Sequence, residues 1–209
     1  MGEYQLEQSG RWVVWCCSRP ARGLSSALLL SIVFYLPVVQ AQGADTASTR
    51  PDIVNYIAYS ETLASSGQPT ASQLKAQAAA GVERVVYLAF TDHDTSLPNE
   101  DRITRGLGMQ FLQVPVLWEA PTVGDFRTFA ALMQEGADRR TLVHCQVNWR
   151  ASSFSFLYRV IFNDVPMDDA VMDLASIWTP SDNWRGFIVE VLAAYGLAPD
   201  CEFCDPLRD

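Results

Sequence analysis

The chain has 209 residues, of which 49% are apolar and 19% charged, and its formal net charge is −9. This acidic balance argues against nucleic acid and against anionic membrane surfaces as partners. A pocket for an anion would therefore have to create its positive potential locally.

Residues 1–41 have the pattern of a secretory signal peptide. Arg19 and Arg22 precede a mostly apolar run over residues 24–38, and cleavage is expected after Ala41. This leader is longer than usual for a signal peptide. Either a start codon placed too early or an N-terminal membrane anchor that is retained would explain its length. The apolar run is shorter than the roughly 20 residues of a membrane span, which favours cleavage. We therefore expect an exported protein, periplasmic or secreted, with no stable membrane partner after cleavage.

The rest of the chain suits one domain. Residues 42–52 are small and polar and indicate a linker, and residues 53–209 contain no internal repeat. Their length is enough for one substantial hydrophobic core. Loss of residues 1–41 would leave 12 basic and 22 acidic residues, a net charge of −10.

Helix and strand signals alternate through the first half of the domain. Thr70, with Gln73 three residues later, predicts the capped start of a helix. Residues 82–89 are rich in β-branched side chains and predict a buried strand. A second strand is expected over residues 109–116, and a helix over residues 122–135.

A loop rich in carboxylates, residues 90–102, follows the first of these strands. It contains one histidine and four acidic residues: His93, Asp92, Asp94, Glu100 and Asp101. Such a group could bind a metal, but its spacing matches no known ligand pattern. We therefore predict a solvated acidic loop and no metal site.

A short strand, residues 141–144, ends at Cys145 and a polar turn, and apolar side chains at helical spacing follow over residues 151–161. A turn that opens a helix presents unpaired N–H groups and the positive end of the helix dipole, which suit an oxyanion. The same field would favour the cysteine thiolate, a nucleophile. Arg150 could bind a phosphate or carboxylate through two parallel hydrogen bonds. This turn is the candidate site.

The last part of the chain predicts two helices, over residues 167–176 and 182–195. Cys201 and Cys204 then form a Cys-x2-Cys pair near the end of the chain. A zinc site would need a second such pair, so a local disulfide is the expected state in an oxidising compartment. Cys145 would then be the unpaired thiol.

The residues of the turn resemble the His-Cys-x5-Arg-Ser/Thr signature of the cysteine-dependent phosphatases, the tyrosine and dual-specificity superfamily. The matching residues are His144, Cys145, Asn148, Arg150 and Ser152. More closely, residues 56–160 resemble a bacterial phosphatase-like family associated with β-lactamase-like hydrolases. That family's domain usually opens with the phrase found here at residues 66–70, SGQPT.

The order of elements indicates an α/β domain with a mostly parallel central sheet flanked by helices, and the resemblance implies the same cysteine-phosphatase-like fold. It also implies a hydrolase of phosphomonoesters that uses a phosphocysteine intermediate and needs no metal or organic cofactor. The partner would be a phosphorylated substrate or another small oxyanion.

The resemblance further implies a role for each residue of the site. Cys145 would be the nucleophile, His144 would order the loop behind it, and Ser152 would tune the thiolate. The phosphoryl oxygens would be bound by the Arg150 side chain and by the backbone N–H groups of Gln146, Val147, Asn148, Trp149 and Arg150.

A carboxylic acid must protonate the leaving group as the cysteine attacks phosphorus. In the family this acid lies in a loop after the second of the strands described above. Glu119 is the first candidate for this role and Asp125 the second. The alternative is that Glu119 is a polar loop residue and Asp125 a carboxylate in the first turn of a helix.

The signature departs from the family at its centre. Cys145 and Arg150 enclose four residues where the family has five, and Asn148 occupies the place of a glycine. One residue fewer near a helix start turns the next side chain by roughly 100°. Transition-state stabilisation would be lost if Arg150 could not reach the anion, while modest anion binding could survive.

Three interpretations follow. The first is the hydrolase, and the second is a catalytically inactive pseudophosphatase that binds an anion or a partner protein. In the third, Cys145 is a buried apolar residue and Arg150 the ion-pair partner of a carboxylate. The direction of the Arg150 side chain distinguishes them.

Overall fold

The computed structural model describes residues 51–201 and 204. The predicted signal peptide, residues 1–41, lies outside these residues, as does the predicted linker up to residue 50. Within the described part, no helix combines the length and the apolar character that crossing a membrane requires.

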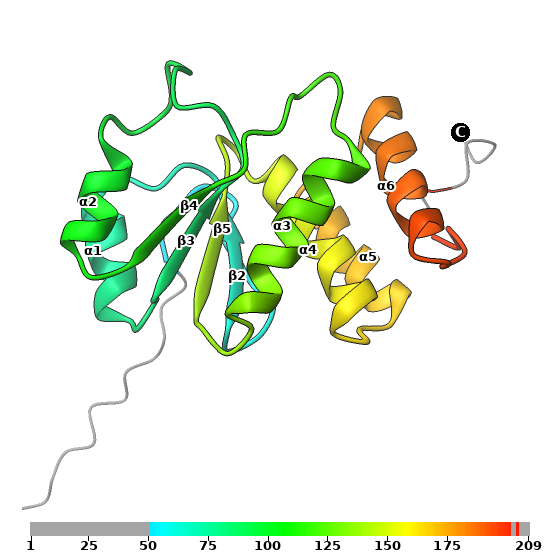
Figure 1. Ribbon diagram of the computed structural model, residues 1–209, viewed down its shortest axis with the longest axis horizontal. Coiled ribbons are helices and arrows are strands. Elements are labelled where there is room, and N and C mark those ends of the chain that lie inside the picture. The colour runs from blue at the N-terminus through cyan, green and yellow to red at the C-terminus, as the bar shows by residue number, and fades with distance from the viewer. Residues whose placement is uncertain (1–50, 202–203, 205–209) are drawn as a thin grey trace, which may run out of the picture. The chain divides into compact units, whose positions relative to one another are not determined.

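The centre of the fold is a five-stranded sheet with the order β1-β2-β5-β3-β4 (Figure 1). The strands are β1 (Ile57–Ala58), β2 (Leu63–Ser66), β3 (Arg84–Tyr87), β4 (Gln110–Gln113) and β5 (Thr141–His144). Only β1, at one edge, runs antiparallel to its neighbour. The prediction of an α/β fold with a mostly parallel sheet is confirmed.

Six helices surround this sheet among the described residues. They are α1 (Ala71–Ala79), α2 (Glu100–Gly106), α3 (Val123–Glu135), α4 (Trp149–Phe162), α5 (Met167–Ala175) and α6 (Asp182–Ala194). Figure 1 shows α1 and α2 on one side of the sheet and α3 to α6 on the other. Thr70 caps α1 in a capping box with Gln73, as predicted, and Thr122 caps α3 in the same way with Asp125.

Helix α4 is the core helix of the fold. Its residues from Ala151 to Arg159 are all buried, whereas a surface helix buries only one stripe. It packs against β2 and β5 on one side and against α3, α5 and α6 on the other. The cysteine turn at the start of α4 is therefore held by a deeply buried helix.

The parallel register brings three strand ends to one edge of the sheet. His144, the last residue of β5, pairs with Ser66 at the end of β2 and with Tyr87 at the end of β3. The residues that follow these strands therefore lie together, as expected for a site at the carboxyl ends of a parallel sheet. SGQPT and the cysteine turn, about 80 residues apart in sequence, meet here.

One prediction is wrong. Residues 90–102 are not all a solvated loop, because helix α2 begins at Glu100 and the Glu100 side chain is buried. A lone carboxylate near a run of acidic residues gives no sign in the sequence that it will face the interior. Its partners in the fold explain its burial, and they belong to the candidate site.

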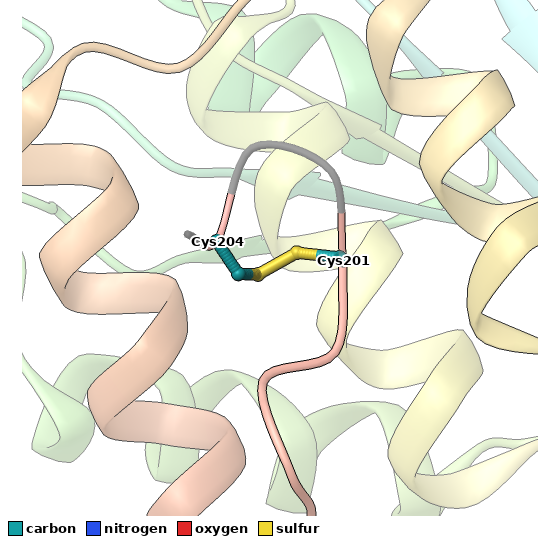
Figure 2. The surroundings of a disulfide bond; sticks show 2 residues. All are labelled: Cys201 and Cys204. Atoms are coloured by element: carbon teal, nitrogen blue, oxygen red, sulfur yellow. A yellow bond between two sulfur atoms is a disulfide. The ribbon is translucent and has the colours of Figure 1, made fainter. Parts of the chain in front are cut away.

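The C-terminal tail carries the disulfide between Cys201 and Cys204 shown in Figure 2. Both cysteines are buried and contribute to the hydrophobic core cluster. This agrees with the expected local pairing. Among residues 51–201 and 204, Cys145 is then the free cysteine.

Candidate active site

The turn between β5 and α4 has the backbone of an anion site. Asn148 is the N-cap residue of α4 and has a left-handed φ of 74°. The backbone therefore turns sharply between Cys145 and the first residue of the helix. The Asn148 N–H takes part in the antiparallel bridge between Gly67 and Val147. Within the described part of the chain, no acceptor is found for the other N–H groups of the turn, those of Gln146, Val147, Trp149, Arg150 and Ala151. Five donors at a helix start therefore remain available for a bound oxyanion.

A pocket of about 430 Å³ opens in front of this turn. It is lined by Phe90, His93, Leu117, Trp118, Glu119, Cys145, Gln146, Val147, Trp149 and Arg150. Cys145 is only 1% exposed, so its sulfur lies at the inner end of the pocket. The pocket thus joins the predicted nucleophile, the predicted cation and the first candidate acid.

Arg150 points inward, not to solvent. Its Nε donates to the carbonyl oxygen of Val116 at 3.0 Å, and one terminal nitrogen donates to Oε1 of Gln146 at 2.8 Å. The guanidinium also lies over the Trp118 ring, 5.2 Å from its centre. The spacing of four residues therefore still delivers a cation to the pocket.

The environment of Arg150 confirms this placement. Burial lowers the pKa of its guanidinium, and nearby Cys145, Tyr87 and Glu119 act against that shift. A partly buried arginine facing a cysteine and a carboxylate across a small pocket supplies the local positive charge that this acidic protein otherwise lacks.

His144 lies behind the cysteine in a buried polar cluster that the sequence analysis missed. Its ring stacks on Tyr87, and its Nε2 is 2.9 Å from Oε1 of Glu100. That pair is a close polar contact and not an aligned hydrogen bond. The other carboxylate oxygen of Glu100 accepts a hydrogen bond from Nε2 of Gln68 at 2.9 Å.

The SGQPT phrase supports the turn directly. The Gln68 N–H donates to the carbonyl oxygen of Gln146 at 2.9 Å, and Gly67 bridges to Val147. A Cβ at position 67 would lie 2.8 Å from the Gln146 carbonyl oxygen, so only glycine fits. The phrase therefore holds the site without lining the pocket.

The two candidate acids are in different places. Glu119 is exposed and lines the pocket, whereas Asp125 accepts hydrogen bonds from the Thr122 N–H and hydroxyl at the start of α3. His93, from the acidic loop, also lines the pocket. An imidazole can act as a general acid too, so His93 is a candidate that the sequence analysis assigned no role.

The remaining predicted residues occupy the rim and the back of the site. Val147 and Trp149 are exposed at the rim, and Trp149 stacks on Trp178. The Ser152 hydroxyl donates to the carbonyl oxygen of Trp149 at 3.2 Å. It makes no hydrogen bond to Cys145 within the part of the chain that the structure describes.

Among residues 51–201 and 204, no group of three or more His, Cys, Asp or Glu side chains is placed so that it could bind a metal ion. The chemistry available to the pocket is that of a thiol, a guanidinium, a carboxylate and backbone N–H groups. These are the functional groups that a cysteine-dependent phosphoryl-transfer reaction uses.

Comparison with known proteins agrees with this class. Two crystal structures of a candidate phosphatase (DUF442) from Shewanella putrefaciens CN-32 have TM-scores of 0.64 and 0.62 to this chain. Their sequence identities are 29% and 31%, over 69% of this chain and 95% and 92% of theirs. No protein-family model matches the chain, and no curated protein matches it in sequence.

More distant structures share the fold alone. Tk-PTP in its active form is 17% identical over 66% of this chain and 95% of its own, with a TM-score of 0.57. PTPMT1 in complex with PI(5)P is 14% identical over 68% of this chain and 96% of its own, with a TM-score of 0.58.

The fold is that of the cysteine-dependent phosphatase superfamily. Within it, the chain belongs to the same family as the DUF442 protein of Shewanella putrefaciens. The predicted association of this family with β-lactamase-like hydrolases stays a prediction.

Proposed function

We propose that the protein is a cysteine-dependent phosphomonoester hydrolase. One observation carries this proposal: the inward Arg150 guanidinium lines the pocket that Cys145 reaches, together with Gln146, Val147 and Trp149 of the turn, whose backbone N–H groups have no acceptor among the described residues. Preorganised donors of this kind stabilise the charge that develops on a phosphoryl group in the transition state.

In the proposed first step, the Cys145 thiolate forms a bond to phosphorus while the bond from phosphorus to the leaving oxygen breaks. The electron pair stays on that oxygen, which takes a proton from Glu119. In the second step, water attacks phosphorus and gives a proton to the Glu119 carboxylate. The sulfur–phosphorus bond breaks, and inorganic phosphate and the thiolate are released.

The pocket walls favour a leaving group with an apolar body. Four large apolar side chains line the pocket and are exposed to solvent: Phe90, Leu117, Val147 and Trp149. Trp118 adds a further aromatic wall. A substrate with a phosphate at one end and an apolar or aromatic group at the other would satisfy both parts of the pocket.

We also propose that the protein is exported, with cleavage after Ala41 and a single folded domain over residues 53–209. The leader pattern supports export. The Cys201–Cys204 disulfide is the kind of bond that persists in an oxidising compartment such as the periplasm.

The direct experiment is turnover of p-nitrophenyl phosphate by the purified protein and by Cys145→Ser. The proposed hydrolase releases p-nitrophenol with the wild-type protein, and the serine variant falls to the background rate. Equal background rates for both proteins would reject hydrolysis.

The second candidate function is a binding protein for anions without turnover. Two observations favour it: Cys145 is 1% exposed, and two donors of the Arg150 fork already bond to protein oxygens. Calorimetric titration with inorganic phosphate distinguishes the two functions. Phosphate binding with no turnover of any phosphomonoester would identify the protein as a pseudophosphatase.

A further inference from the structure

The cysteine turn is held from outside the phosphatase signature by Asn55. The Asn55 Nδ2 donates to the carbonyl oxygen of Val147 at 2.9 Å. In return, the Asn148 Nδ2 donates to the carbonyl oxygen of Asn55 at 2.6 Å. The two residues are 93 positions apart and form a reciprocal pair of side-chain to backbone hydrogen bonds, which we call the asparagine clamp.

Both residues of the clamp have left-handed backbones, with φ of 49° at Asn55 and 74° at Asn148. Asparagine tolerates this region better than most residues with a Cβ. The exchange of the family's glycine for Asn148 therefore keeps the backbone shape of the turn. It also adds an amide donor, which a glycine cannot supply.

The clamp decides the direction of the N–H groups in the turn. In a trans peptide unit the C=O and the N–H point in opposite directions. The Val147 carbonyl oxygen is held by Asn55, so the N–H of Asn148, in the same peptide unit, points the other way, into the bridge between Val147 and Gly67. Gln68 holds the carbonyl oxygen of Gln146, which fixes the N–H of Val147 in the same manner.

We propose that Asn55 is a positioning residue of the active site. Through the clamp it fixes the peptide unit between Val147 and Asn148, so that the free N–H groups on either side of that unit, those of Val147 and Trp149, are presented to a bound oxyanion. This inference rests on the proposed function of the pocket as an anion site. Asn55 itself does not line the pocket, and its side chain reaches the lining through the carbonyl oxygen of Val147.

Phosphate affinity tests the clamp without turnover. The Cys145→Ser protein, expressed from the full chain, is titrated with inorganic phosphate by isothermal titration calorimetry. Asn55→Gly and Asn148→Gly are then added singly and together. Glycine accepts the positive φ at both positions, so each change removes the amide with little backbone strain.

We expect each single variant to bind phosphate about three- to tenfold more weakly, the usual effect of one hydrogen bond. The double variant should lose little more than either single variant, because the two bonds act as one unit. The matched control is Asp164→Gly, an exposed residue with φ of 53° outside the pocket. The dissociation constant of this control for phosphate should lie within about twofold of that of the Cys145→Ser protein, because no hydrogen bond at the site is lost.

Thermal unfolding of each variant separates positioning from general stability. A lowered melting temperature with unchanged phosphate affinity in both asparagine variants would overturn the clamp and leave the proposed function standing. Absence of phosphate binding in the Cys145→Ser parent itself would instead reject the anion site, and the clamp with it.

Discussion

At the scale of single residues, Arg150 answers one question that the short spacing leaves open, because its side chain faces the pocket. Its inward direction depends on three contacts: the carbonyl oxygen of Val116, the side chain of Gln146 and the face of Trp118. A lysine has the charge but not the planar fork, so it cannot make these contacts and also grip an anion.

Arg150→Lys should therefore lower kcat/KM for p-nitrophenyl phosphate by about 100-fold, as expected when transition-state donors are lost. Arg127→Lys, on the exposed side of α3, is the matched control and should leave the rate unchanged. A rate for Arg150→Lys equal to that of the wild type would show that the guanidinium plays no part in catalysis.

Glu119 is tested by the leaving group. Glu119→Gln should slow the hydrolysis of an alkyl phosphate by about 100-fold or more, since that alkoxide needs a proton. The effect on p-nitrophenyl phosphate, whose leaving group needs little help, should be much smaller. Equal losses for both substrates would contradict the acid role, and His93→Ala should then be measured in the same assay.

Asp125→Ala is the contrasting variant for the second candidate acid. Because the Asp125 carboxylate completes the capping box of α3, its loss should cost about 1 kcal/mol of unfolding free energy and leave catalysis intact. Urea unfolding and the alkyl phosphate assay together check this. A large catalytic loss with no change in stability would return Asp125 to the list of acids.

At the scale of elements, helix α2 is tied to the strand that delivers the cysteine. Glu100, at its first turn, contacts His144 of β5 and binds Gln68 of the SGQPT phrase. A residue that the sequence pattern assigns to a solvated loop thus connects α2, β5 and the segment before α1. Because Glu100 is fixed beside His144, the loop between β3 and α2 is held next to the site.

Glu100→Ala should lower the free energy of unfolding by about 1–3 kcal/mol, because it removes the buried carboxylate that accepts a hydrogen bond from Gln68 and contacts His144. Asp101→Ala, the exposed neighbour in the same helical turn, should change it by less than about 1 kcal/mol. Urea denaturation measures both. Equal effects of the two changes would mean that the buried cluster does not stabilise the fold.

At the scale of the whole molecule, the described C-terminal tail is fastened by the Cys201–Cys204 disulfide and by burial of both cysteines in the core. The bond closes a very short loop far along the chain from the cysteine turn. Replacing both residues with serine should cost about 2 kcal/mol of unfolding free energy. Phosphate affinity at 25 °C should stay unchanged. A loss of affinity would indicate that the tail supports the pocket.

Much of the fold could be predicted from the sequence, because local signals decide it. The Thr70 and Gln73 capping box, the buried strand within residues 82–89 and the apolar helix after Cys145 all appear where the patterns place them. Strand β2 gives no such signal, since Ala64, Ser65 and Ser66 are small and lack β-branching. Its place beside β5 comes from tertiary pairing alone.

The sequence by itself determined the class of site. The site is built on a strand, Cys145, a polar turn and the start of a helix, which follow one another directly in the chain and can be recognised without knowing any distant contact. Only the tertiary structure decided that Arg150 faces the pocket, that Glu100 is buried against His144, and that Asn55 holds the turn. Each of these depends on groups brought together by the parallel sheet from distant parts of the chain. Such contacts leave no periodic pattern, because they are made once, between single residues.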